Sequence, residues 1–172
     1  KFRTPSSEIT QYIMLPKQGE ELYFITGVNW GECRKLLRVD FPVDPDIEWA
    51  GCDIPYGLFK RKTHVQTEED FAKFEFCSRG FTDVSDTEGG AAVASDSKYG
   101  YSCRNGVLGL SLLRSPIDPD PYADLGYHEF TYAFVPHSKE LAESDVRNVS
   151  ASLNSPDITV YSSERPESVN LP

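Results

Sequence analysis

Apolar and polar side chains alternate along several short stretches of this chain. In residues 35–43, every second side chain from Leu37 to Val43 is apolar, whereas the charged Arg38 and Asp40 fall between them. An extended chain places such positions on opposite faces, so this stretch predicts a strand with one face in a core. Similar runs, rich in aromatic and β-branched residues, recur between Gly, Pro, Asn and Asp, which is typical of antiparallel sheets.

Two further patterns support a mostly β structure. Aromatic side chains occupy alternate positions of residues 130–134, which predicts a half-buried strand. The dipeptide Asn105-Gly106 separates residues 99–103 from the apolar residues 107–113. Because Asn and Gly tolerate positive φ angles, this dipeptide predicts a tight type I′ turn and therefore a β-hairpin.

A single segment predicts a helix. We expect Ser138 to cap its first turn and Pro156 to end it. Residues 1–160 are predicted to form one β-domain, and residues 161–172, with few apolar side chains, to form a tail or a linker to a further segment. Apolar side chains recur in the helical segment at three- and four-residue spacing, at Leu141, Ala142, Val146, Val149 and Leu153.

The net charge and the cysteines indicate which classes of partner and which redox compartment to expect. With 17 Lys and Arg against 27 Asp and Glu, the formal net charge is −10, which repels nucleic-acid backbones and anionic membrane surfaces. No stretch approaches the ~20 apolar residues of a membrane helix. We therefore expect no nucleic-acid and no membrane partner. The four widely spaced cysteines are expected to be buried as small apolar side chains, which favours a reducing, cytoplasmic location.

The richest polar stretch is residues 110–130. An apolar strand there delivers Arg114 into a loop that three prolines stiffen, and the chain then returns as the aromatic strand. We expect Arg114 and the carboxylates of Asp118, Asp120 and Asp124 to cluster at one end of a sheet. The alternative is a purely structural loop in which Arg114 pairs locally with an aspartate.

Signatures of an independent enzyme are missing from the sequence. There is no Gly-x-Ser-x-Gly elbow, no His-Glu-x-x-His helix and no Gly-rich phosphate loop. His128 is followed by Glu129, but adjacent strand residues point to opposite faces, so a hydrogen-bonded structural histidine is expected rather than a metal ligand. The residues alone therefore predict a binding or structural β-domain without a metal site.

Three blocks of sequence, in order, resemble the C-terminal region of glycoside hydrolase family 38 α-mannosidases. The third block resembles the family motif almost position for position, whereas Ser95, Leu125 and Tyr127 depart from the residues usual in the family. The first block is VNWGE (28–32) with KLLRVDFPV (35–43), IPYG (54–57) and RKTH (61–64), the second is FEFC (74–77) with AAVASDSKYGY (91–101), and the third is LSLLRSPIDPDPYADLGYHEFTYAFVPH (110–137).

This resemblance implies the fold and locates the chemistry outside this chain. It implies an antiparallel β-sandwich of the galactose-mutarotase-like, supersandwich type with at most one short helix. It also implies a retaining exo-α-mannosidase whose zinc ion, aspartate nucleophile and aspartate acid/base lie mainly in an N-terminal α/β domain. None of those residues has a counterpart here, so we expect no catalytic residue and no cofactor in this segment, and no activity from the segment alone.

The resemblance also implies partners and a role. The partners are the catalytic domain of the same parent chain and a mannose-containing oligosaccharide, with this domain at the rim of the sugar pocket. Arg114 is the first candidate for substrate binding, because its guanidinium offers several donors in a fixed fork. Asp96, Asp124 and His128 are further candidates, more as residues that fix the loop. The alternative from another class is a free-standing carbohydrate-binding or scaffold module.

Overall fold

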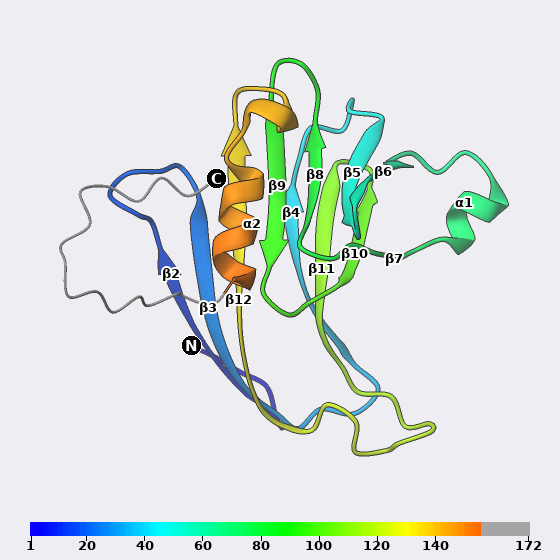
Figure 1. The fold of residues 1–172 in the computed structure, drawn as a ribbon. Coiled ribbons are helices and arrows are strands. Elements are labelled where there is room, and N and C mark those ends of the chain that lie inside the picture. The colour runs from blue at the N-terminus through cyan, green and yellow to red at the C-terminus, as the bar shows by residue number, and fades with distance from the viewer. Residues whose placement is uncertain (156–172) are drawn as a thin grey trace.

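Two antiparallel sheets face each other in the computed structural model, which describes residues 1–155 (Figure 1). The larger sheet has the order β1 (Phe2–Arg3), β2 (Glu8–Met14), β3 (Leu22–Trp30), β12 (Gly126–His137), β9 (Gly90–Ser95), β8 (Phe81–Ser85), β5 (Trp49–Ile54), β6 (Gly57–Lys62). The smaller has the order β4 (Leu36–Pro42), β11 (Val107–Arg114), β10 (Gly100–Arg104), β7 (Phe76–Cys77). The predicted all-β sandwich is confirmed.

The main core lies between the two sheets. Strand β4 contributes the alternating face predicted from the sequence, and β12 contributes the aromatic stripe. The ring of Tyr132 stacks on that of Phe24 with centroids 5.0 Å apart, and Phe134 stacks on Phe41 at 4.8 Å. The first pair joins β3 to β12 within the larger sheet, and the second ties that sheet to β4 of the smaller sheet.

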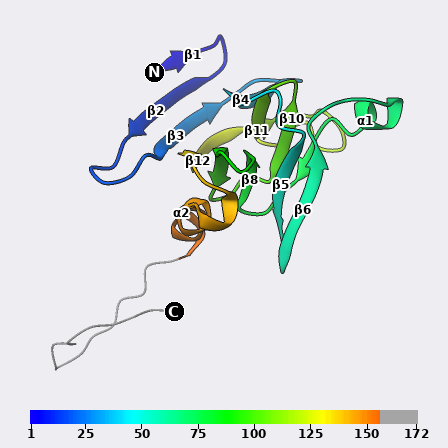
Figure 2. The same ribbon diagram turned by 90° about the horizontal axis from the view of Figure 1, so that it is seen from above.

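A second apolar layer covers the outer face of the larger sheet. Helix α2 (Val146–Asn154) lies there, on the side opposite to the smaller sheet (Figure 2). Its buried Val146 and Val149 pack on side chains of β9 and β12, including Ala133 and Val135. Strand β12 is therefore covered on both faces, since its alternate side chains enter the other core.

The hairpin predicted at Asn105-Gly106 is confirmed. Strands β10 and β11 pair antiparallel from Gly100 with Ser111 to Arg104 with Val107. The two turn residues have φ angles of 50° and 72°, as a type I′ turn requires.

The helices differ from the sequence prediction in two respects. The expected helix does not start at Ser138: residues Leu141–Glu143 form a 3₁₀ turn, and α2 begins only after Asp145. A further helix, α1 (Glu68–Ala72), was not predicted, so the expectation of a single helix is corrected. Thr67 and Asp70 form a reciprocal capping box at its start, which stabilises a helix of only five residues.

The expectation that all four cysteines are buried is wrong for two of them. Cys52 and Cys103 are buried and all four thiols are free, but Cys33 and Cys77 are exposed. Cys77 lies on the two-residue strand β7 at the edge of the smaller sheet, and Cys33 lies in the turn after β3. The predicted tail, residues 161–172, lies outside the described residues. None of the helices in residues 1–155 has the length and apolar character needed to cross a membrane.

A buried histidine–aspartate pair joins the end of β12 to the middle of the larger sheet. His137 Nε2 lies 2.9 Å from Asp83 Oδ1, and both side chains are almost fully buried. Because the carbonyl of Lys139 accepts from His137 Nδ1 at 2.7 Å, Nδ1 carries a hydrogen. Burial raises the pKa of Asp83, against the hydrogen bonds from Ser85 and His137. One proton therefore belongs between His137 Nε2 and the Asp83 carboxyl.

We expect Leu110→Ala to lower the free energy of unfolding by about 2–5 kcal/mol, because it opens a cavity between the sheets. Leu110 is 0% exposed, whereas Val107, in the same strand, is 37% exposed. Val107→Ala is the matched control and should change stability by less than about 1 kcal/mol. Urea denaturation measures both, and equal losses would contradict the assigned core.

Candidate functional site

The loop between β11 and β12, residues 115–125, projects from one end of the sandwich (Figure 1). Its first residue is anchored, because the buried Trp30 Nε1 donates to Ser115 Oγ at 2.6 Å. Backbone hydrogen bonds of 2.9 and 3.0 Å also join Ser115 to Arg34 and Lys35 in the turn between β3 and β4. The first residue of the loop is therefore held by hydrogen bonds to β3 and to the turn after it, in addition to its connection to β11.

Asp124 closes the base of this loop. It adopts a left-handed backbone conformation with φ 59°, and its Oδ2 accepts a hydrogen bond of 2.8 Å from the backbone N–H of Arg114. His128 Nε2 lies 2.9 Å from the backbone oxygen of Asp124, so Nε2 is the donor. The prediction of a hydrogen-bonded structural histidine at 128 is confirmed.

Asp96 fixes the neighbouring turn, which follows β9. Its Oδ2 accepts from the backbone N–H of Thr131 at 2.7 Å, and its Oδ1 accepts from Ser97 Oγ at 2.7 Å. Its own backbone N–H donates to the Thr131 carbonyl at 3.1 Å. The turn is thus held against β12 by two hydrogen bonds of one residue, and the third bond lies within the turn.

Lys98 is a member of this site that the sequence analysis did not single out. Its half-buried side chain places Nζ 4.6 Å from the centroid of the Phe130 ring. Partial burial lowers the pKa of Lys98, and the charges of Asp124 and Asp96 act in the opposite direction. Lys98 therefore adds a positive charge whose field acts on the carboxylates of both turns. In the sequence, the only indication of its role was its position as the single lysine of the motif block 91–101.

The four predicted residues lie at the same end of the sandwich, but not as predicted in every detail. Arg114 and His128 are each hydrogen-bonded to Asp124, whereas Asp96 is bonded to β12 instead and shares with Asp124 only an electrostatic effect on Lys98. Within residues 1–155, Arg114 forms no ion pair with an aspartate: its backbone is held, and its exposed guanidinium is left for other acceptors. In place of the salt bridge considered from the sequence, Asp124 accepts a hydrogen bond from the backbone N–H of Arg114.

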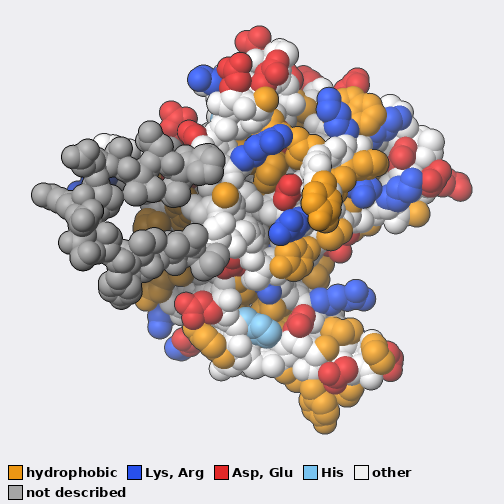
Figure 3. Space-filling model, viewed as in Figure 1, with side chains coloured by type: hydrophobic (Ala, Val, Ile, Leu, Met, Phe, Trp, Pro, Cys, Tyr) orange, Lys and Arg blue, Asp and Glu red, His pale blue; other side chains and the backbone are white. Residues whose placement is uncertain are grey.

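Asp118 and Asp120 do not join this group. Both are exposed, and Asp120 Oδ1 accepts from the backbone N–H of Tyr122 at 2.9 Å, which caps a turn within the loop. Figure 3 shows acidic, basic and histidine side chains gathered on this lower part of the molecule, with apolar side chains toward the loop tip. The expected clustering of all three aspartates with Arg114 is corrected to Asp124 alone.

The arrangement suits hydrogen bonding to a polar ligand rather than bond cleavage. Arg114 and Lys98 supply donors, and Tyr122 and Tyr127 expose aromatic rings nearby in the chain. In the described part of the chain, no group of three or more His, Cys, Asp or Glu is placed to hold a metal ion. The residues described do not fit a zinc site, and no reaction step is assigned to one here.

The family description "Glycosyl hydrolases family 38 C-terminal domain" matches residues 1–122 of this chain. The chain belongs to this family. The match covers the first two motif blocks, strand β11 with Arg114, and the third block as far as Tyr122.

Curated relatives extend the match beyond residue 122. The chain is 39% identical over 153 residues to "Alpha-mannosidase 2C1" of Homo sapiens, and 40% identical over 164 residues to "Alpha-mannosidase G" of Dictyostelium discoideum. These matches cover 89% and 95% of this chain. In both cases the chain spans only 15% of the relative's length.

Solved structures share the fold. An α-mannosidase from Enterococcus faecalis V583 matches with a TM-score of 0.71 at 20% identity, covering 83% of this chain and 18% of that one. A glycosyl hydrolase family 38 protein from Enterococcus faecalis matches with a TM-score of 0.74, covering 86% and 18%. At this level of identity the likeness establishes the fold alone.

Replacing Asp124 tests the closure of the loop. We expect Asp124→Ala to lower the free energy of unfolding by about 1–2 kcal/mol, because alanine removes the acceptor for the Arg114 N–H and disfavours positive φ. Asp124→Asn keeps an acceptor and tolerates that backbone conformation, so it should lose less than about 1 kcal/mol. Chemical denaturation compares them, and equal losses would exclude the proposed hydrogen bond.

Proposed function

We propose that this chain is the C-terminal domain of a larger α-mannosidase that hydrolyses terminal α-linked mannose from oligosaccharides. The observation that carries the proposal is the pairing of near-complete coverage of this chain with 15% coverage of relatives named as α-mannosidases. In this proposal the domain packs on a catalytic domain of the same polypeptide.

The catalytic machinery is proposed to lie in that other domain. Zinc, when bound there, supplies Lewis-acid chemistry to glycoside cleavage. The four free thiols fit a reducing compartment, and we place the protein in the cytoplasm on that ground.

Arg114 is proposed to contribute to the rim of the sugar pocket. Its backbone is fixed by Asp124 at the end of β11, so the guanidinium extends from a rigid base. Five donors in a planar fork suit either a carboxylate of the catalytic domain or a pair of sugar hydroxyls. Lys98, Asp96 and His128 would act through position, because each is already bound within this domain or lies against Phe130.

The rim role predicts a loss of activity without a loss of fold. In the full-length enzyme, we expect Arg114→Ala to lower kcat/KM on an aryl α-mannoside roughly tenfold to a hundredfold, since a hydrogen bond to a charged group is worth about 1.5–3 kcal/mol. The melting temperature should stay within about 2 °C of the wild type.

Arg147→Ala is the matched control, because Arg147 is equally exposed but lies on α2, on the outer face of the larger sheet. Its kcat/KM should equal that of the wild type. A lowered melting temperature with unchanged kcat/KM in Arg114→Ala would assign Arg114 a structural role and contradict the rim proposal.

The division between domains has its own test. The isolated 172-residue chain and the full-length protein are assayed on an aryl α-mannoside with zinc present. We expect turnover from the full-length protein and none from the isolated chain. Turnover by the isolated chain would show that the catalytic residues lie within it.

A further inference from the structure

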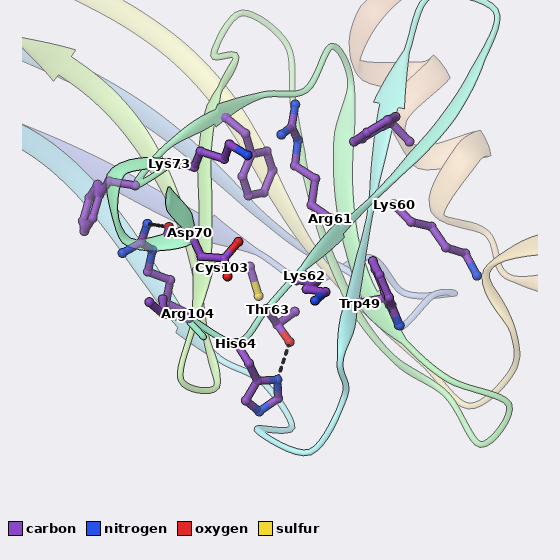
Figure 4. Close-up of a pocket in the computed structure, with 14 residues that line it drawn as sticks. Trp49, Lys60, Arg61, Lys62, Thr63, His64, Asp70, Lys73, Cys103 and Arg104 are labelled. Carbon is purple, nitrogen blue, oxygen red and sulfur yellow. Dashed lines mark hydrogen bonds between the residues drawn. The ribbon is translucent and has the colours of Figure 1, made fainter. Parts of the chain in front are cut away.

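A second hollow lies on other elements, along the edge strand β6, helix α1 and the end of β10. Its volume is about 250 Å³, slightly below the ~300–1,000 Å³ typical of small-molecule sites. Figure 4 shows the side chains of Arg61, Lys73 and Arg104 arranged around Cys103. The hollow shares no residue with the loop that carries Arg114.

The charge of this hollow is opposite to that of the protein. Five of its lining residues are basic, whereas the only carboxylate among them is Asp70. The whole chain has a formal net charge of −10. The basic lining residues are Lys60, Arg61, Lys62, Lys73 and Arg104.

Asp70 does not neutralise the two arginines. Its Oδ2 accepts from the backbone N–H groups of Thr67 and Gln66, at 3.1 and 3.3 Å, as part of the cap of α1. Within residues 1–155, neither Arg61 nor Arg104 forms an ion pair with a carboxylate. Lys73 is paired with Glu69 at 2.6 Å, but the other four basic residues keep the hollow positively charged.

Arg104 and Cys103 add no negative charge. Arg104 donates to the backbone oxygens of Asp70 and Phe71, at 2.8 and 3.0 Å, which are neutral acceptors. Burial raises the pKa of the Cys103 thiol to about 12, so the thiol is protonated at neutral pH. The floor of the hollow is thus neutral and its walls are cationic.

Aromatic rings hold the arginines in place. The guanidinium carbon of Arg61 lies 5.0 Å from the ring centroid of Phe59 and 5.2 Å from that of Phe76. Arg104 lies 4.8 Å from the ring centroid of Phe74. Such stacking restricts the orientation of the guanidinium planes before a ligand arrives. Figure 3 shows basic and apolar side chains interspersed over this part of the molecule.

Arg61 also has a donor left without an acceptor. Its Nε is buried and has no hydrogen-bond partner in the described part of the chain. Buried polar groups are nearly always satisfied in native proteins, and exceptions concentrate at functional sites or at sites of ions. Phe59 and Phe74 are 50% and 51% exposed, so their rings offer apolar surface beside the cations.

We propose that this hollow binds a small phosphorylated sugar. A phosphate group carries about two negative charges and several acceptor oxygens, which suit converging Arg and Lys donors. The exposed rings offer a surface for the apolar face of a sugar ring, and the volume excludes a long oligosaccharide. The acidic remainder of the molecule disfavours a nucleic acid as the source of the phosphate.

Calorimetric titration of the full-length protein at low ionic strength tests this site, with glucose 6-phosphate, inorganic phosphate and glucose as probes. We expect glucose 6-phosphate to bind with a Kd below about 1 mM, inorganic phosphate to bind more weakly, and glucose to show no binding. Arg61→Gln should weaken glucose 6-phosphate binding at least about tenfold. Equal behaviour of glucose 6-phosphate and glucose would overturn the proposal.

Two further variants keep the result independent of folding. Lys62 is exposed and forms no ion pair within residues 1–155, so Lys62→Gln removes one charge of the hollow without disturbing the stacked rings, and we expect binding about threefold to tenfold weaker. Lys17→Gln removes the same charge from an exposed position outside the hollow and should leave Kd unchanged. Equal Kd values in Lys62→Gln and Lys17→Gln would reduce the effect to general ionic attraction and reject the site.

Discussion

Strand β12 is the constraint on which the rest of this structure depends. It pairs with β3 through Gly126–Phe134 and with β9 through Tyr132–His137, so its backbone is bonded on both sides. Its alternate side chains enter two different cores, one against the smaller sheet and one against α2. A shift by one residue would exchange the two faces, which fixes its register strongly. The loop that carries the candidate site starts from β11 and ends at the first residue of β12. At the other end of β12, the buried pair of His137 and Asp83 joins this strand to β8 of the same sheet.

Patterns confined to one or two elements were predictable from the sequence. The alternation in residues 35–43, the aromatic stripe of 130–134 and the turn at Asn105-Gly106 each depend on local geometry, and each is found as expected. The position of Arg114 at the end of an apolar strand was predictable for the same reason. The family resemblance in the motif blocks is confirmed by the match over residues 1–122.

Features that depend on distant contacts were not predictable. The sheet order places β12 between β3 and β9, a choice that pairing between remote segments decides. Helix α1 has only five residues, which is too short for an apolar periodicity to indicate it. Its capping box uses Asp rather than the more common Glu or Gln, so the start of the helix was also not evident. The role of Lys98 depends on Asp96 and Asp124, whose charges both act on it although they lie in separate turns of the chain. Whether a cysteine is covered, as Cys103 is and Cys77 is not, also depends on neighbours far along the chain.

The basic residues of β6 have a consequence for association between molecules. Strand β6 is the last strand of the larger sheet in the described residues, so one side of its backbone carries unpaired N–H and C=O groups. Such an edge invites a strand from another chain, and natural proteins often discourage this with lysines. Lys60, Arg61 and Lys62 follow one another there, so an identical edge from a second copy would bring six like charges together. The opposite edge of the same sheet consists of β1, which is only two residues long. Charge on β6 thereby disfavours the pairing of copies through this edge, whereas β1 covers only Glu8 and Ile9 of β2 and leaves the rest of that strand without a neighbour on this side in the described residues.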